Sequence, residues 1–267
     1  MLKKLLVSLL SALLCMSVVA ETESQLNGNQ NETDVKIDEN GDVFVAPLWY
    51  HISSDSTAEV IWNRFYKDME SVVIPSEIKI AGHVYPVTSI GDIAFSFCSG
   101  LTNIEIPSSV TSIGYGTFRS CSGLTSIEIP SSVTSIEGTA FSGCSGLTSI
   151  GIPSRVTSIG VYAFSECYSL TSIEIPSSVT SIGFDAFSKC SGLTNINVAL
   201  DNTAYSSENG ILYNKNKTEL ISVPLGMKGE VKVPSSVTSI GYYAFRDCSG
   251  LTEIYIPSSV THIEDGA

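Results

Sequence analysis

The side chains that most often carry catalysis or bind metals are few in this sequence and form no recognisable site. The three histidines, His51, His83 and His262, are far apart, and none has metal-ligand spacing with another. The G-x-S-x-G, P-loop and H-E-x-x-H motifs are absent. Serine is abundant, but its positions follow an internal repeat, and a residue type copied into every repeat serves the scaffold. We therefore expect no enzyme activity, no metal and no cofactor.

The cysteines could form a metal site, disulfides or a buried column. Five of them recur 23 residues apart, at Cys98, Cys121, Cys144, Cys167 and Cys190, and Cys248 follows in the same motif. One cysteine per repeat does not match the ligand spacing of a zinc cluster. Stacked repeats would bring neighbouring Cα atoms to about 5 Å, within disulfide range, but equivalent Cβ atoms would point in parallel and not at each other. We expect a column of free, buried thiols.

The elements that position these residues are copies of one 23-residue unit, most regular from Leu124 to Gly146. The phenylalanines recur with the same period, at Phe95, Phe118, Phe141, Phe164 and Phe187. A period of about 20–29 residues that begins with L-x-x-I-x-I is typical of a leucine-rich solenoid. In such a fold, residues one period apart become neighbours, so we expect the phenylalanines to form one inner column.

Each unit is expected to contain short β-strands and one short helical turn. Alternation in residues 124–129 predicts a parallel strand with its isoleucines inward. Pro130 ends this strand because it lacks an N–H group. Val133 and Ile136 return to the core, and the Ala-Phe-x-x-Cys segment at 140–144 suits one helical turn with an apolar face.

The consensus I-P-S-S-V-T-S-I-G-x-x-A-F-x-x-C-S-G-L-T-S-I resembles the BspA-type leucine-rich repeats of bacterial and protozoan surface proteins, over about residues 72–267. The resemblance implies an exported, surface-displayed solenoid associated with adhesion to host proteins and other cells, with no shared catalytic residues. Serine replaces the asparagine ladder of conventional leucine-rich repeats, at Ser109, Ser132, Ser178, Ser236 and Ser259, with Arg155 as the exception. We expect these hydroxyls to bond the adjacent backbone.

Outward-facing strand positions form the first candidate binding surface, expected on the concave face of the solenoid. We call these residues the carboxylate column; they are Glu105, Glu128, Glu174, Asn197, Glu253 and Tyr255. Stacked carboxylates about 5 Å apart disfavour joint ionisation, and a cation or a basic partner would relieve this. The alternative is a solvated face of copied residues.

A second candidate surface comes from the variable positions that precede Ala-Phe in each repeat. We call it the aromatic patch; it comprises Tyr115, Tyr162, Phe184, Tyr242 and Tyr243. Tyrosine is enriched in interfaces, so exposed aromatic side chains here could bind a partner. The alternative is lateral packing between repeats.

The N-terminus predicts export. Residues 1–20 resemble a signal peptide, with Lys3 and Lys4 before an apolar run and Val18-Val19-Ala20 as the cleavage site. The apolar run is too short to span a bilayer, and no other segment could cross a membrane. A lipoprotein acylated at Cys15 is the alternative. The formal net charge is −13, and −15 without Lys3 and Lys4, which disfavours nucleic acid as a partner.

The remaining chain divides into a leader at 21–34, a β cap at 35–71 and repeats at 72–267. The alternative for the cap is an aromatic ligand pocket built on Trp49 and Trp62. We expect a hairpin near Ala81-Gly82-His83 and a hairpin island at about 201–229. The sequence ends within a repeat at Ala267, as expected for a fragment or a truncated product.

These observations predict a non-catalytic surface protein that binds an extracellular protein or glycan. The alternatives are an architectural spacer for a further C-terminal domain, or the non-catalytic part of a larger secreted enzyme.

Overall fold

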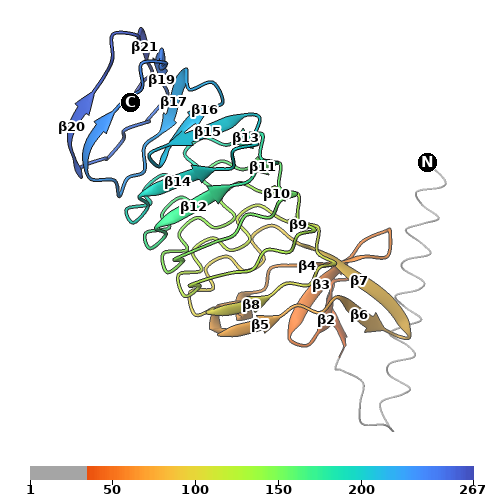
Figure 1. The fold of residues 1–267 in the computed structure, drawn as a ribbon. Helices are drawn as coiled ribbons and strands as arrows, with labels where there is room; N and C mark the ends of the chain where they lie inside the picture. Colours follow the sequence, from red (N-terminus) through yellow and green to blue (C-terminus); the bar gives the residue numbers. More distant parts are fainter. Residues whose placement is uncertain (1–34) are drawn as a thin grey trace.

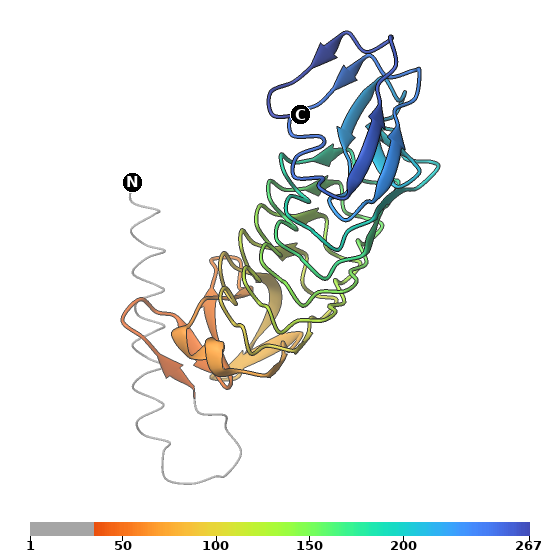
Figure 2. The ribbon, with the colours of Figure 1, turned by 90° about the vertical axis from the view of Figure 1, so that its left-hand side faces the viewer.

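Successive repeats form rungs that stack along one axis (Figures 1 and 2). The computed structural model describes residues 35–267, so the predicted signal peptide at 1–20, Cys15 and the leader at 21–34 lie outside the described residues. Positions 23 residues apart lie side by side, as in the parallel pairing of Ser135 with Ser158 and Ile136 with Ile159. The predicted leucine-rich solenoid and its period are confirmed. No helix within residues 35–267 is both long and apolar enough to cross a membrane.

One face of the solenoid carries the L-x-x-I-x-I segments. Its strands are β5 (Ser71–Val73), β8 (Asn103–Glu105), β12 (Ser172–Ile175), β14 (Asn195–Val198), β18 (Gly229–Lys232) and β20 (Leu251–Tyr255). They form three parallel pairs, β5–β8, β12–β14 and β18–β20. The same alternation of exposed and buried side chains continues through residues 126–129, where no strand is assigned. The predicted inward isoleucines are therefore present, but the predicted strand at 124–129 is not.

The T-S-I segments form the second face. Its strands are β7 (His83–Ile90), β9 (Ser112–Ile113), β10 (Ser135–Ile136), β11 (Ser158–Ile159), β13 (Ser181–Ile182), β17 (Glu219–Ser222), β19 (Ser239–Ile240) and β21 (His262–Ile263). They pair in parallel in the series β7–β9, β10–β11–β13 and β17–β19–β21. Short parallel strands on two faces enclose the narrow core.

The chain turns between the two faces without the helical turn expected at 140–144. Every second N–H group donates within its own rung, as from Cys144 to the carbonyl of Phe141 at 3.2 Å. The intervening N–H groups donate to the next rung, as from Phe141 to the carbonyl of Ala163 at 2.8 Å. Because alternate donors leave the rung, no helix forms there. The one helix of residues 35–267 is the 3-10 helix η1 (Arg64–Asp68).

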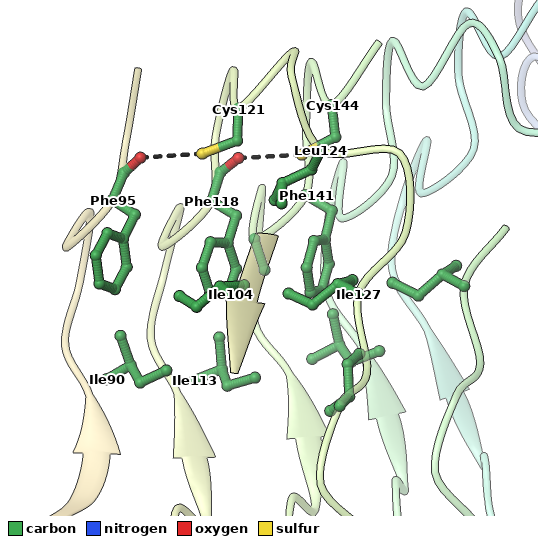
Figure 3. Packing of buried hydrophobic residues seen from close by; sticks show 14 of the residues in the cluster. Ile90, Phe95, Ile104, Ile113, Phe118, Cys121, Leu124, Ile127, Phe141 and Cys144 are labelled. Atoms are coloured by element: carbon green, nitrogen blue, oxygen red, sulfur yellow. Dashed lines mark hydrogen bonds between the residues drawn. The ribbon is translucent and has the colours of Figure 1, made fainter. Parts of the chain in front are cut away.

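The phenylalanines form one inner column, as predicted (Figure 3). Neighbouring rings from Phe95 to Phe187 have centroids 5.5–5.9 Å apart and planes within 15° of parallel. Tyr66, in η1, stacks on Phe95 at 5.2 Å and so extends the column beyond the first rung. The stack buries one large apolar side chain per rung, which stabilises neighbouring rungs together but could not stabilise a single rung alone.

The cysteines are free, and those from Cys98 to Cys190 are buried, as predicted; Cys248 is partly buried. Each thiol from Cys121 to Cys190 donates to the carbonyl of the phenylalanine in the preceding rung, as from Cys121 to Phe95 at 3.0 Å and from Cys144 to Phe118 at 3.1 Å (Figure 3). Burial raises the pKa of Cys98 to about 11 and that of Cys144 to about 12. These thiols are structural donors and stay protonated near neutral pH.

The serine hydroxyls behave as predicted in two rungs. Ser178 donates to the carbonyl of Val156 at 2.6 Å, and Ser132 donates to that of Val110. The prediction is wrong for Ser109 and Ser259, whose buried hydroxyl oxygens have no partner within residues 35–267.

The N-terminal segment is an antiparallel sheet joined to the first rung. It consists of β1 (Lys36–Ile37), β2 (Val43–Val45), β3 (Leu48–Ile52) and β4 (Ala58–Val60), and β4 pairs in parallel with β7. Tyr66 contributes its ring to the phenylalanine column, and its hydroxyl accepts a hydrogen bond from the N–H of Trp49. These are contacts that an end cap would make, so we retain the cap as our proposal. Trp49 packs on Phe44, and Trp62 is half exposed.

Two hairpins interrupt the repeats where they were predicted. The first joins β6 (Glu77–Ile80) to β7 through Ala81 and Gly82. The second joins β16 (Ile211–Asn214) to β17. The structure adds β15 (Tyr205–Glu208), which pairs with β16 and was not predicted. The second hairpin inserts a different kind of rung into the stack.

Candidate functional site

The hairpin island makes one rung turn shorter than the others. Leu220 pairs with Ile240, and Val231 pairs with Ile254, so these residues hold equivalent places in neighbouring rungs. Ile240 and Ile254 are 14 residues apart, whereas Leu220 and Val231 are only 11 apart. The turn between β17 and β18 therefore lacks three residues, and the surface must be recessed there.

Val223 occupies the place of the column phenylalanine in this shortened turn. In a regular rung the phenylalanine N–H donates to the alanine carbonyl of the next rung, as from Phe164 to Ala186 at 2.8 Å. Val223 makes the equivalent bond, to the carbonyl of Ala244 at 2.8 Å. A smaller side chain thus follows Phe187 in the column, and the ring stack is interrupted.

A recess of about 570 Å³ opens beside the shortened turn. Its size falls within the range of about 300–1,000 Å³ that is usual for ligand sites. Its apolar lining includes Phe187, Leu193, Leu212 and Val223. The recess adjoins the turns at 183–190 and 241–248, so it spans the place of the missing residues.

All five residues of the aromatic patch line this recess; they are Tyr115, Tyr162, Phe184, Tyr242 and Tyr243. Phe184 joins two of them in edge-to-face contacts, with its ring centroid 6.0 Å from that of Tyr162 and 5.6 Å from that of Tyr243. The five side chains nevertheless remain 36–55% exposed. The predicted patch is therefore one continuous surface, held partly by packing between rungs.

An acid–base pair crosses the recess between two rungs that the island separates. The Arg246 Nη1 atom lies 3.6 Å from Oδ2 of Asp185, and its guanidinium group lies 4.9 Å from the centre of the Tyr243 ring. The Asp185 side chain is only 12% exposed. Burial raises the pKa of the Asp185 carboxyl, and the charge of Arg246 opposes this. The pair offers a fixed carboxylate and a stacked cation to a polar group of a ligand.

The carboxylate column lies on the face of the solenoid that carries the L-x-x-I-x-I segments, and its side chains are exposed. The structure brings Glu174 and Asn197 opposite each other on β12 and β14. On β18 and β20, Lys232 pairs with Tyr255 and lies 5.3 Å above its ring, while hydrogen bonding to Glu253 raises the pKa of Tyr255. Glu105 on β8 and Glu128 make no ion pair with any residue of 35–267. The column is an open, mostly acidic surface.

This chemistry suits binding. Within residues 35–267, no three His, Cys, Asp or Glu side chains are grouped closely enough to hold a metal ion. His51 lies 2.9 Å from Asp42, and His262 lies 3.0 Å from Glu264, and neither histidine lines the recess. The recess combines aromatic surface and an apolar floor with seven charged side chains, a mixture that suits recognition of a ligand.

Sequence reasoning missed Asp185, Arg246 and Val223 as members of the site. The spacing of the repeats could have indicated the site, because the 11 residues from Leu220 to Val231 are fewer than in a regular rung and mark a shortened turn. The role of Val223 in the recess becomes clear only when Val223 is aligned with the phenylalanines of the column.

A family model described as the BspA type leucine rich repeat region matches the chain in six copies, over residues 88–218 and 228–267. The unmatched stretch between these ranges includes the shortened turn. A search of curated proteins found no match.

Several solved structures resemble this fold. A leucine-rich cell surface protein of Faecalibacterium prausnitzii is 27% identical, with a TM-score of 0.63, over 88% of this chain and 73% of that one. A leucine-rich repeat protein of Bacteroides ovatus is 27% identical, with a TM-score of 0.58, over 86% and 78%. One from T. pallidum is 28% identical, with a TM-score of 0.53, over 81% and 83%.

Proposed function

Because the chain belongs to the BspA-type leucine-rich repeat family, we propose that it is an exported, non-catalytic binding protein of the cell surface. Its ligand is an extracellular protein or glycan. Binding takes place in the recess beside the shortened turn, with the aromatic patch as its main contact surface.

The convergence of the aromatic patch on one recess carries this proposal. Five aromatic residues from four rungs, far apart in sequence, line the same hollow, and each keeps more than a third of its surface exposed. Lateral packing alone would bury such side chains, since burying a large apolar side chain is worth roughly 1.5–3 kcal/mol. Exposed aromatic anchors in a recess are typical of binding hot spots.

Display outside the cell is supported by relatives. The similar Faecalibacterium prausnitzii protein is described as a cell surface protein. The N-terminal segment 1–20, with its lysines and apolar run, supports export in this chain.

The purified protein should be tested against panels of extracellular matrix proteins and glycans. We expect a Tyr162→Ala, Phe184→Ala variant to bind the identified ligand at least about tenfold more weakly, which is a loss of about 1.4 kcal/mol or more. Tyr168→Ala is the matched control, because Tyr168 is an exposed tyrosine of the same rung outside the recess.

The carboxylate column provides the competing site. Glu128→Lys and Glu174→Lys should leave binding unchanged if the recess is the site. A loss of binding in these variants, with normal binding by the recess variant, would move the site to the carboxylate column. No ligand at micromolar concentration in either panel would count against a binding role.

A further inference from the structure

Neighbouring rung turns are joined by a repeating set of three backbone hydrogen bonds. The donors are three N–H groups: that of the column phenylalanine itself, that of the residue two positions before it, and that of the residue two positions after it. Tyr162, Phe164 and Glu166, for example, donate to the carbonyls of Phe184, Ala186 and Ser188 at 3.1, 2.8 and 2.9 Å. The same three bonds join each earlier pair of turns, beginning with those at Ile93, Phe95 and Phe97.

This set is missing where the recess opens. The corresponding N–H groups of Asp185, Phe187 and Lys189 donate no hydrogen bond to any of residues 35–267. Across the recess, the carbonyl of Ala244 accepts from Val223, but those of Tyr242 and Arg246 accept from no residue of the same range. One side of the recess thus carries three alternating free donors, and the other carries two free acceptors.

The phenylalanine column has a gap at the same place. Phe187 is 8% exposed, whereas Phe95, Phe118, Phe141 and Phe164 are fully buried. The next position of the column holds Val223, whose side chain is smaller than a phenyl ring. The recess therefore lacks both a strip of backbone and part of an aromatic ring.

We propose that the recess binds a short segment of a partner protein, which takes the place of the residues missing from the shortened turn. Alternate carbonyls of that segment accept hydrogen bonds from the N–H groups of Asp185, Phe187 and Lys189. One aromatic side chain of the segment enters beside Phe187 and above Val223. This inference rests on the proposed binding function and chooses a protein over a glycan as the ligand.

A peptide fits these groups better than a sugar does. Its carbonyls recur with the same alternation as the free donors, as in partners that add a strand to an open sheet edge. Two of the five aromatic faces are already engaged, because Phe184 contacts two rings and Tyr243 is covered by Arg246. The apolar floor of Phe187, Leu193 and Val223 suits the aromatic side chain of such a segment.

The first test uses the free protein and one probe. Amide hydrogen exchange followed by NMR should be faster at Asp185, Phe187 and Lys189 than at their counterparts Tyr162, Phe164 and Glu166. The probe is an acetylated, amidated peptide with the sequence of residues 160–166, which is the chain's own regular turn. It should slow exchange at the three free amides at least tenfold at saturation, and the same peptide with its phenylalanine replaced by serine should bind at least tenfold more weakly.

The second test fills the gap. Val223→Phe should weaken binding of the probe at least tenfold, because the new ring completes the column; Val223→Leu, a smaller change, should give a partial loss if Val223→Phe does not fold. Equal protection of the two sets of amides in the free protein, or unchanged probe binding in both variants, would overturn the inference. Protection of the free amides by a glycan, or by self-association seen in sedimentation, would also overturn it.

The two proposals fail in different ways. Normal ligand binding by the Tyr162→Ala, Phe184→Ala variant would remove the recess as the proposed site. Loss of binding in that variant, together with no response of the three amides to the probe, would remove only the inserted peptide.

Discussion

Two residues in every rung turn that holds a phenylalanine adopt a left-handed backbone conformation, whatever side chain they carry. They lie two positions before and two positions after the column phenylalanine, and their φ angles are between +52° and +75°. Only Gly116 and Gly143 are glycines among them. This conformation turns alternate N–H groups toward the next rung. Since a non-glycine residue there costs roughly 1–2 kcal/mol, hydrogen bonding between rungs must offset the strain.

Thr139 is the residue where this strain is least compensated. It is β-branched, its φ is +53°, and its buried hydroxyl oxygen has no partner within residues 35–267. Thr139→Gly should raise the free energy of unfolding by about 1–2 kcal/mol, because it removes both penalties. Urea unfolding followed by circular dichroism would measure the change.

The reciprocal control is Gly116→Thr, at the equivalent place of the preceding rung. It should lower the free energy of unfolding by at least as much, since Gly116 has a φ of +59° and an added Cβ would lie 3.2 Å from Oγ1 of Thr139. A Thr139→Gly variant less stable than the wild type would mean that the threonine methyl group contributes more than the strain costs.

The thiol column predicts a loss of stability in alkali. Burial raises the pKa of Cys144 from 9.0 to about 12. Below pH 9 the thiol is protonated in both the folded and unfolded states, and its contribution to stability is fully present. Between pH 9 and about 12 only the unfolded state ionises, so stability falls by about 1.4 kcal/mol per pH unit for this thiol. Urea midpoints from pH 8 to 10.5 should fall more steeply in the wild type than in Cys144→Ala, and parallel curves would contradict the prediction.

At the scale of elements, the rungs could be predicted from the sequence but the conformation of their turns could not. The 23-residue period determined which residues become neighbours, and the inward isoleucines, the phenylalanines and the cysteines follow from it. The Ala-Phe-x-x-Cys spacing also suits a helix, and nothing local reveals that alternate N–H groups bond to the next rung. That choice depends on a neighbour 22 residues away.

The candidate site, likewise, could be predicted from the sequence only in part. The variable positions before Ala-Phe identified the aromatic patch, because exposed aromatic residues interrupt an otherwise copied pattern. The recess itself arises where the stacking of rungs is interrupted. The sequence shows how many residues the shortened turn lacks, but it does not show that a recess forms there. Asp185 and Arg246 are 61 positions apart, and only the path of the island brings them together.

Asn202 fixes the start of the island and gives a test at this scale. Its fully buried amide nitrogen donates to the carbonyls of Pro176 and Val179 at 2.8 and 2.9 Å, and its oxygen accepts from the N–H groups of Ala204 and Tyr205. Asn202→Ala should lower the free energy of unfolding by about 2–4 kcal/mol, because it leaves buried backbone groups unpaired.

The exposed Asn197 is the matched control for this change. Asn197→Ala should alter stability by less than about 0.5 kcal/mol in the same urea titration. Similar losses in both variants would indicate that the buried amide has no special role at the entry to the island.

At the scale of the whole molecule, the island divides one solenoid into two packed regions. Buried residues from Val43 to Ile196, with Leu212, form the first apolar cluster, and those from Ile211 to Ala244 form the second. The division falls at the shortened turn, where the phenylalanine column and the three backbone bonds between turns are both interrupted. In repeat proteins stability is approximately a sum of rung and nearest-neighbour terms, so a weak interface separates units that can open independently.

Two equivalent valines test this independence. Val133 and Val237 hold the same place in their rungs, and both are fully buried. Val237→Ala should lower the free energy of opening of residues 229–267 by about 2 kcal/mol, which speeds their hydrogen exchange about 30-fold. Exchange in residues 88–198 should be unchanged. Val133→Ala should do the reverse, or should affect both regions if the second folds only upon the first. Mass spectrometry of peptides from each region would distinguish these results. If both variants speed hydrogen exchange equally in both regions, the missing backbone bonds and the interrupted phenylalanine column at the recess do not uncouple the two regions.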